Sequence, residues 1–289
     1  MQRLREFLFI KRPNTPGYGI SRNAYLTVLA GRSGLPSIAE VIAPKAEAPV
    51  VAGFGVPMSA GGGRALLEKP IERGTYGFAS LDKKTALRVA VLPPAEAGFH
   101  PDALLQSPAA VNLREEVRWR IGSAWWLIQI TFESHHAEVI PALSFWISVA
   151  RRMAELTAGV IADPLAEKYL LPEDVHDPQG FDIRDHISVI QSPARIATRG
   201  MSKFALPEIQ FSDVEPDDRD LAAGFLYSVA DAILHRGPIE PGNQIGTVEV
   251  PIDVAAAPNL QGPPVLELIP PPGKTVGQAV TLIHDAHER

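Results

Sequence analysis

Hydrophobic and polar positions are most regular in two stretches of the chain, and both predict amphipathic helices. From Val139 to Thr157 the apolar residues recur every three or four positions, which places them on one face of a helix. The same spacing recurs from Pro216 to His235, where acidic residues fill the first turn and basic residues the last. These two helices are the clearest elements that the pattern predicts.

The residues that flank the helical stretches predict where each helix ends. Gly159 suits the left-handed residue that closes the first helix, and Gly237 followed by Pro238 stops the second. A third helix is expected near the end of the chain, beginning after Thr275 as its cap. A short exposed helix is expected over 112–121, which is rich in charged residues.

Short apolar runs between turn-forming residues predict the strands. The runs 85–92 and 123–132 do not alternate cleanly, so we expect both strands to be buried between layers. The run 265–269 lies between prolines and predicts an edge strand, and 255–264 is expected to be a linker. The other predicted strands are 25–29, 49–54, 159–161, 186–191, 194–200, 204–211 and 246–252.

The order of these elements predicts an α+β fold. A mixed or antiparallel sheet layered with the amphipathic helices would cover each apolar stripe, and two ferredoxin-like strand–helix–strand units are one way to build it. Residues 1–74 are expected to form a Pro/Gly-rich N-terminal arm or irregular layer, with a disordered tail as the alternative. Residues 75–253 form the expected α+β core, and 254–289 a Pro-rich connector and C-terminal helix.

Composition narrows the class of protein. The 289 residues carry a net charge of −6, which argues against nucleic acid as a partner, and no apolar run approaches the ~20 residues of a membrane span. There is no cysteine, so disulfides and thiolate chemistry are excluded. We expect a cytoplasmic protein without membrane insertion, and no motif indicates a cofactor.

Histidines and carboxylates gather in two runs where predicted elements meet. Imidazole and carboxylate side chains together can bind zinc, manganese or iron. The candidate metal ligands are Glu133, His135, Asp163, His176, Asp185 and His186. The alternative interpretation is that these residues are ordinary turn formers and helix caps, because no pair has the spacing of a helical metal motif.

Tryptophan is the second unusual feature, because all four lie within a short part of the chain, from Trp119 to Trp146. Trp125 and Trp126 are adjacent, so on a strand they point to opposite faces and one of them needs a separate cover. They are therefore candidates for binding a partner. Packing in the core is the alternative.

The segment from Ala197 to Ile209, with Thr198-Arg199-Gly200-Met201 followed by Ala205-Leu206-Pro207-Glu208, resembles a signature of bacterial proteins of unknown function. In those proteins a strand ends in a His/Thr-x-Gly-Met/Leu turn, and Gly/Ala-Leu-Pro-Glu follows within a few residues. The resemblance implies an α+β fold and no assigned activity. Arg199 stands where a second histidine often occurs in them.

These observations favour a non-catalytic binding or assembly module that acts on a protein partner or on a second copy of itself. Two alternatives stay open. The first is a metal-dependent hydrolase that uses the histidine and carboxylate residues. The second is a small-molecule sensor with a pocket between sheet and helices.

Overall fold

The computed structural model describes residues 18–42, 68–80, 82–135, 139–177, 180–193, 195–258 and 264–288. Its internal contacts divide the chain into two compact units. The central unit is Arg22–Asp185, and the terminal unit combines the chain's start, described from residue 18, with the segment from His186 onward. These boundaries fall at 21/22 and 185/186 rather than at 74/75 and 253/254. The predicted strand 49–54 lies outside the described residues.

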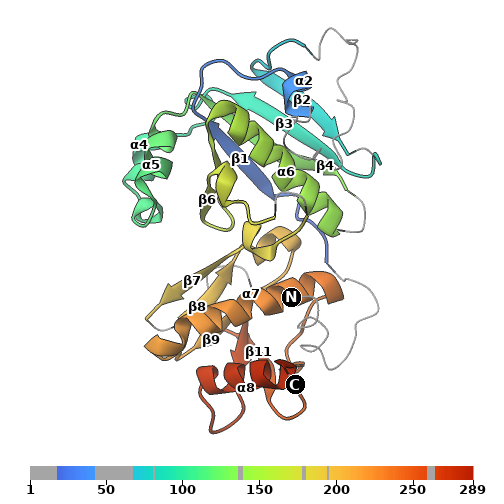
Figure 1. The fold of residues 1–289 in the computed structure, drawn as a ribbon, viewed down its shortest axis with the longest axis vertical. Helices are drawn as coiled ribbons and strands as arrows, with labels where there is room; N and C mark the ends of the chain where they lie inside the picture. The colour runs from blue at the N-terminus through green and yellow to red at the C-terminus, as the bar shows by residue number, and fades with distance from the viewer. Residues whose placement is uncertain are drawn as a thin grey trace. The chain divides into compact units, whose positions relative to one another are not determined.

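The central unit is built on a six-stranded sheet in which every neighbouring pair is antiparallel. β1, the first strand in sequence, lies between β4 and β5 in the sheet's interior (Figure 1). The strands, in spatial order, are β2 (Gly74–Ala79), β3 (Ala86–Leu92), β4 (Trp126–Ser134), β1 (Tyr25–Ala30), β5 (Val160–Asp163) and β6 (Lys168–Leu170).

One face of this sheet is covered by α6 (Val139–Thr157), which has the bounds that the hydrophobic pattern predicts. Val28 and Ile128 point to this face and are fully buried. Trp146 of α6 is also fully buried, and its indole N–H donates to the Ile130 carbonyl at 3.0 Å. The short helix α2 (Ile38–Ile42) packs beside α6.

Among the described residues, helices cover the opposite face at one end. There α4 (Pro101–Leu105) and α5 (Glu115–Gly122) lie over the sheet, and Val117 and Ile121 of α5 pack with Leu29 and Val160 in one hydrophobic cluster. The helix predicted over 112–121 is therefore present as α5, but one side of it is buried rather than exposed.

β3 corrects the prediction that its strand is buried on both faces. Leu87, Val89 and Val91 are buried. Arg88 is exposed, and the other residues of the strand are half-buried, so burial alternates along β3. The hydrophobic pattern did not reveal this alternation, because Ala90 on the outer face is apolar like the buried Val89 and Val91 beside it. β3 thus has one buried face and one partly exposed face.

The turn from α6 into β5 corrects the role of Gly159. The residue with left-handed backbone is Ala158, at φ +49°, and Gly159 donates its N–H back to the Ala154 carbonyl at 2.8 Å. A Cβ on Gly159 would lie 2.7 Å from the Leu29 carbonyl oxygen. Glycine is therefore required at 159 for the close approach of two strands, not for its backbone angle.

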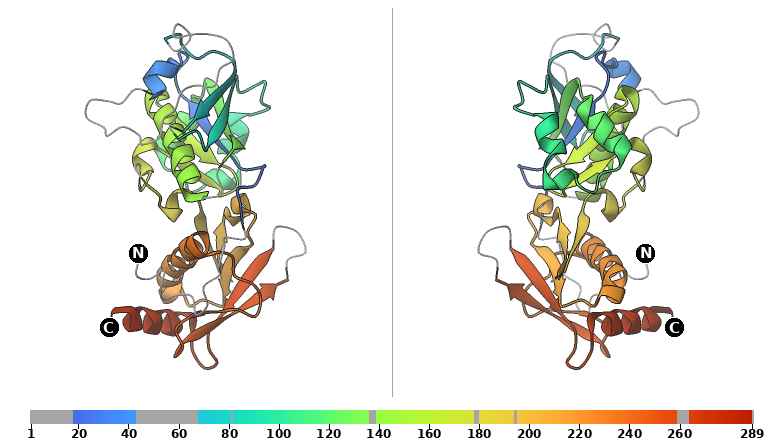
Figure 2. Two further views of the ribbon diagram at one scale, coloured as in Figure 1. Left: turned by 90° about the vertical axis from the view of Figure 1, so that its right-hand side faces the viewer. Right: turned by 90° about the vertical axis from the view of Figure 1, so that its left-hand side faces the viewer.

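The terminal unit holds a second six-stranded sheet, with the helices α7 (Arg219–Arg236) and α8 (Val276–Glu288) packed against each other on one side (Figure 2). Its neighbouring strands are antiparallel except for the parallel pair β12 and β9. In spatial order they are β10 (Gln244–Gly246), β11 (Pro251–Ala257), β12 (Val265–Ile269), β9 (Glu208–Ser212), β8 (Arg195–Arg199) and β7 (Ser188–Ser192).

The C-terminal helix begins as predicted, because the Thr275 hydroxyl accepts the Gln278 N–H at 3.2 Å. Three strand predictions in this unit are corrected. β12 is not an edge strand but lies between β11 and β9, and residues 255–257 belong to β11 rather than to a linker. The predicted strand 246–252 contains a turn, because β10 ends at Gly246 and β11 begins at Pro251.

The two sheets and their helices confirm the α+β class. The ferredoxin-like arrangement is not confirmed. In the central unit α6 connects β4 to β5, and one strand, β1, lies between them. In the terminal unit α7 connects β9 to β10, and two strands lie between those. The helix crossovers therefore differ in the two halves of the chain.

Candidate functional site

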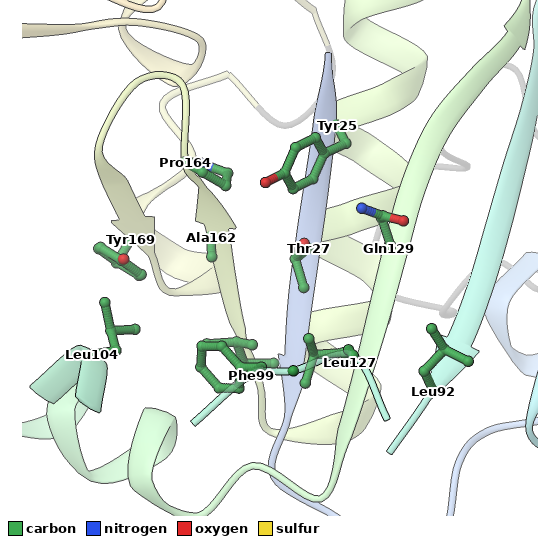
Figure 3. A pocket seen from close by; sticks show the side chains of 13 residues that line it. Tyr25, Thr27, Leu92, Phe99, Leu104, Leu127, Gln129, Ala162, Pro164 and Tyr169 are labelled. Carbon is green, nitrogen blue, oxygen red and sulfur yellow. The ribbon is translucent and has the colours of Figure 1, made fainter. Parts of the chain in front are cut away.

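A cavity of about 470 Å³ lies on the open face of the central sheet, opposite α6 (Figure 3). Side chains of β1, β3, β4 and β5 form its floor, and the segment that joins β3 to α4 forms part of its wall. The volume is within the range of small-molecule sites, roughly 300–1,000 Å³. All lining residues belong to the central unit.

The floor consists of two rows of residues that pair across the strands. Leu29, Leu127 and Leu92 make an apolar row, because Leu127 pairs with both of the others. Thr27 pairs with Gln129, which begins a polar row one step along the strands. Figure 3 shows Thr27 and Gln129 toward one end of the cavity and Leu127 toward the other.

Backbone hydrogen bonds within the segment between β3 and α4 fix this part of the cavity wall. Pro93 and Pro94 end β3, and their carbonyls accept the N–H groups of Ala97 at 3.3 Å and Phe99 at 3.0 Å. Gly98 adopts φ +65°, which glycine tolerates without strain. The Phe99 ring is thereby placed over the apolar row of the floor, and Pro101 starts α4 immediately afterwards.

Polar side chains with unused hydrogen-bonding capacity face the cavity. In the described part of the chain, no residue forms a hydrogen bond with the side chains of Tyr25, Thr27, Gln129 or Tyr169. Burial, the largest influence, raises the pKa of Tyr169, and the nearby Glu167 and Tyr25 raise it further. Tyr169 is therefore a neutral hydroxyl that can donate a hydrogen bond at physiological pH.

The cavity has no charged lining among the residues that the structure describes. Aromatic and aliphatic walls favour an apolar body, and hydroxyl and amide groups at one end can orient it by hydrogen bonds. The arrangement is suited to binding and contains no paired acid and base for proton transfer.

Comparisons with known proteins give no match: neither a family model, nor a curated protein, nor a solved structure matches the chain. Across the described ranges, none of the helices combines the length and apolar character needed to cross a bilayer.

Of the six predicted metal ligands, His176 and Asp185 are brought into direct contact. Asp185 is 1% exposed, and its carboxylate accepts the His176 Nδ1–H at 2.8 Å and the backbone N–H groups of His176 and Asp177. The carboxylate therefore holds a turn as well as an imidazole. Nearby, Asp182 is bound by Arg184: burial raises its pKa, but the Arg184 hydrogen bonds and charge outweigh burial and keep it low.

The other predicted ligands lie in ordinary structural positions. Asp163 is buried and accepts the Ala166 N–H at 3.1 Å in the β5–β6 turn. Glu133 is exposed near the end of β4, and the His135 ring contacts the edge of Phe132. His186 is buried, and its carbonyl accepts the Lys203 ammonium.

Within the described ranges, no group of three or more histidine and acidic side chains is arranged to hold one metal ion. The metal-dependent hydrolase stays a prediction that metal analysis of the purified protein would test.

The tryptophans divide between core and surface. Trp146 fills the core, whereas Trp119 is 70% and Trp125 61% exposed. Trp126 lies at the start of β4, and its indole N–H donates to the Ser33 carbonyl at 2.8 Å. Of the two candidates for partner binding, Trp125 is therefore the more accessible.

The segment that carries the resemblance forms a buried turn. Glu208 is 1% exposed, and its carboxylate accepts the Thr198 hydroxyl at 2.8 Å and the Gly200 N–H at 2.9 Å. Gly200 and Ala205 both have positive φ, at +108° and +55°. Residues 200–207 thus build the β8–β9 connection, and Ala205 adopts a left-handed backbone that glycine would tolerate with less strain.

Sequence reasoning did not find the cavity. Its residues come from five separated segments, and none forms a recognisable motif. The only available signal was the polar Thr27 and Gln129 in otherwise apolar strands, because such positions mark a strand face that is not packed against a helix.

Proposed function

We propose that the protein binds a small organic ligand in the cavity of its central unit. The observation that carries this proposal is a set of four polar side chains, Tyr25, Thr27, Gln129 and Tyr169, that form no hydrogen bond with any described residue. They line an otherwise apolar cavity of about 470 Å³. Gln129 is exposed and Tyr25 and Tyr169 are half-buried, so these groups can hydrogen-bond to water or to a ligand. A ligand with an apolar body and a hydrogen-bonding end matches this lining.

The test uses phenylnaphthylamine, an uncharged dye that fluoresces in apolar surroundings. Ala97 lines the cavity and is exposed, so Ala97→Trp fills the cavity without disturbing the core. Ala95 lies two residues away in the same turn, is exposed and does not line the cavity, which makes Ala95→Trp the matched control.

We expect the wild-type protein and Ala95→Trp to bind the dye with equal affinity, and Ala97→Trp to bind it at least tenfold more weakly. Melting temperatures of the three proteins verify that each is folded. Equal dye binding by all three folded proteins would overturn the proposal.

A second candidate function is self-association through the surface around α5. Three large apolar side chains, Val111, Trp119 and Trp125, are 73%, 70% and 61% exposed there. Exposed tryptophans are enriched at the centres of interfaces. Sedimentation velocity tests it: a concentration-dependent dimer should be lost in Trp119→Ser/Trp125→Ser and retained in Val248→Ser, which removes an 85% exposed apolar side chain of the terminal unit.

A further inference from the structure

The open sheet face continues beyond the cavity into a third row of paired residues. Tyr25 pairs with Thr131, and Thr131 pairs with Arg88. Paired residues on neighbouring strands share a face, so Arg88 lies on the same face as Thr27 and Gln129. Along this face the floor changes from apolar, to neutral and polar, to cationic.

The Arg88 guanidinium has no partner in the described part of the chain. Arg88 is exposed, and no described carboxylate lies within 4.0 Å of it. On its other side it pairs with Gly77 of β2, which has no side chain to crowd it. Glu133 comes two residues after Thr131, but it is the unpaired residue where the β3–β4 register shifts, and it forms no ion pair with Arg88.

Arg88 lies one row of paired residues beyond the polar row of the cavity floor. Positions two apart on a strand are about 6.5–7 Å apart, and diagonal neighbours on adjacent strands are about 7–8 Å apart, within reach of a long side chain. Arg88 is two residues from Ala90, which pairs with Gln129 at the polar end of the cavity. One ligand can therefore contact both.

We propose that the ligand is an organic anion whose apolar body fills the cavity and whose charged group is bound by Arg88. This inference rests on the proposed function. The guanidinium offers a planar pair of N–H donors that matches a carboxylate, sulfonate or phosphate. Thr27 and Gln129 then lie beneath the neutral middle of the ligand, and the leucine row lies beneath its apolar end.

The test compares two dyes with the same aromatic body, neutral phenylnaphthylamine and its sulfonated analogue, anilinonaphthalene sulfonate. Arg88→Gln removes the cation and keeps the polar side chain. Arg195→Gln is the matched control, because Arg195 is an exposed strand arginine in the terminal unit. Binding of the sulfonate to other surfaces is measured with the cavity-filled Ala97→Trp variant and subtracted.

We expect Arg88→Gln to weaken binding of the sulfonate about fivefold to tenfold and binding of the neutral dye less than twofold. Arg195→Gln should change neither, Arg88→Lys should recover part of the affinity, and Glu133→Gln should leave or strengthen sulfonate binding. Added salt should weaken the sulfonate more than the neutral dye.

Two negative results are distinguishable. If Ala97→Trp weakens the neutral dye but Arg88→Gln leaves the sulfonate unchanged, the cavity binds ligands and the anion proposal is wrong. If neither dye responds to Ala97→Trp, the proposed function fails, and the anion proposal fails with it. Repeating the titration with an aromatic carboxylate and a phosphate monoester then shows which anion the site prefers.

Discussion

Glu208 shows how one buried carboxylate can organise a turn. Its oxygens accept hydrogen bonds from the Thr198 hydroxyl and from the backbone of Gly200 and Ser202, three groups that precede it in the chain by ten, eight and six residues. A buried acceptor for several donors is difficult to replace, because each donor left without a partner costs about 1–3 kcal/mol. The residues of this segment therefore have a structural role in the turn.

Glu208→Ala should lower the free energy of unfolding by about 3 kcal/mol or more, because three donors lose their acceptor. Glu208→Gln should cost less, since its amide oxygen still accepts the Gly200 N–H and the Thr198 hydroxyl can accept from its NH₂ group. Urea denaturation measures both. Glu249→Ala, at an exposed position, is the control and should change stability by less than about 0.5 kcal/mol. A neutral effect of Glu208→Ala would contradict the assigned role.

Tyr18 predicts a dependence of stability on alkaline pH. Its hydroxyl donates to the Leu234 carbonyl near the end of α7, and burial raises its pKa to about 12. A raised pKa means that the folded state favours the protonated phenol, so its contribution is complete below pH 10 and is lost as the pH rises through 12.

Tyr18→Phe should therefore be less stable than wild type by about 1 kcal/mol at pH 7, and the difference should shrink between pH 10 and pH 12. Urea denaturation of both proteins across this range measures it. A difference that stays constant up to pH 12 would show that the hydroxyl does not act as the donor.

Among the elements, the connection from α6 to β5 gives the sharpest prediction. Ala158 is left-handed at φ +49°, so Ala158→Gly should relieve backbone strain and raise the free energy of unfolding by up to about 1 kcal/mol. Gly159→Ala should lower it by about 1–3 kcal/mol, because the new Cβ would be 2.7 Å from the Leu29 carbonyl oxygen. Thermal unfolding of the two variants gives the sign of each change, and the signs should be opposite.

The bounds of α6 could be predicted from the sequence, because apolar residues recur every three or four positions over nineteen residues. Over that length a few residues that do not fit the spacing do not hide it. β12 could not be placed, since the prolines beside 265–269 are as common at an edge as at the start of an inner strand. Its parallel pairing with β9 joins residues about 57 positions apart, as in the contact of Gln210 with Glu267, and local patterns contain no information on such pairs.

The candidate site was beyond sequence reasoning for the same reason. Thr27 and Gln129 are opposite each other because β1 pairs with β4. Arg88 lies near them because β3 pairs with β4 on its other side. The sequence correctly placed His176 near Asp185, because those two residues are close along the chain. The sequence leaves open whether the remaining metal candidates converge, because most of them are far apart along the chain.

For the whole molecule, the division into two units predicts that the central unit folds without the terminal unit. The central unit is one continuous segment with its own sheet, helices and cavity. A fragment of residues 22–185 should therefore unfold cooperatively and bind phenylnaphthylamine within about twofold of the full chain. Circular dichroism and the dye titration measure the two properties. A fragment that is folded but does not bind the dye would place part of the site outside the central unit.

The parallel pairing of β9 with β12 also has a consequence during protein synthesis. A ribosome that has made residue 185 has produced every strand of the central sheet, so that unit can fold early. The two halves of the terminal sheet can join only after β12 has been synthesised. Tyr18 can meet Leu234 only after the 216 residues that follow Tyr18, up to and including Leu234, have been added. The terminal unit therefore completes its sheet, and its contact with Tyr18, only after the central unit has been synthesised.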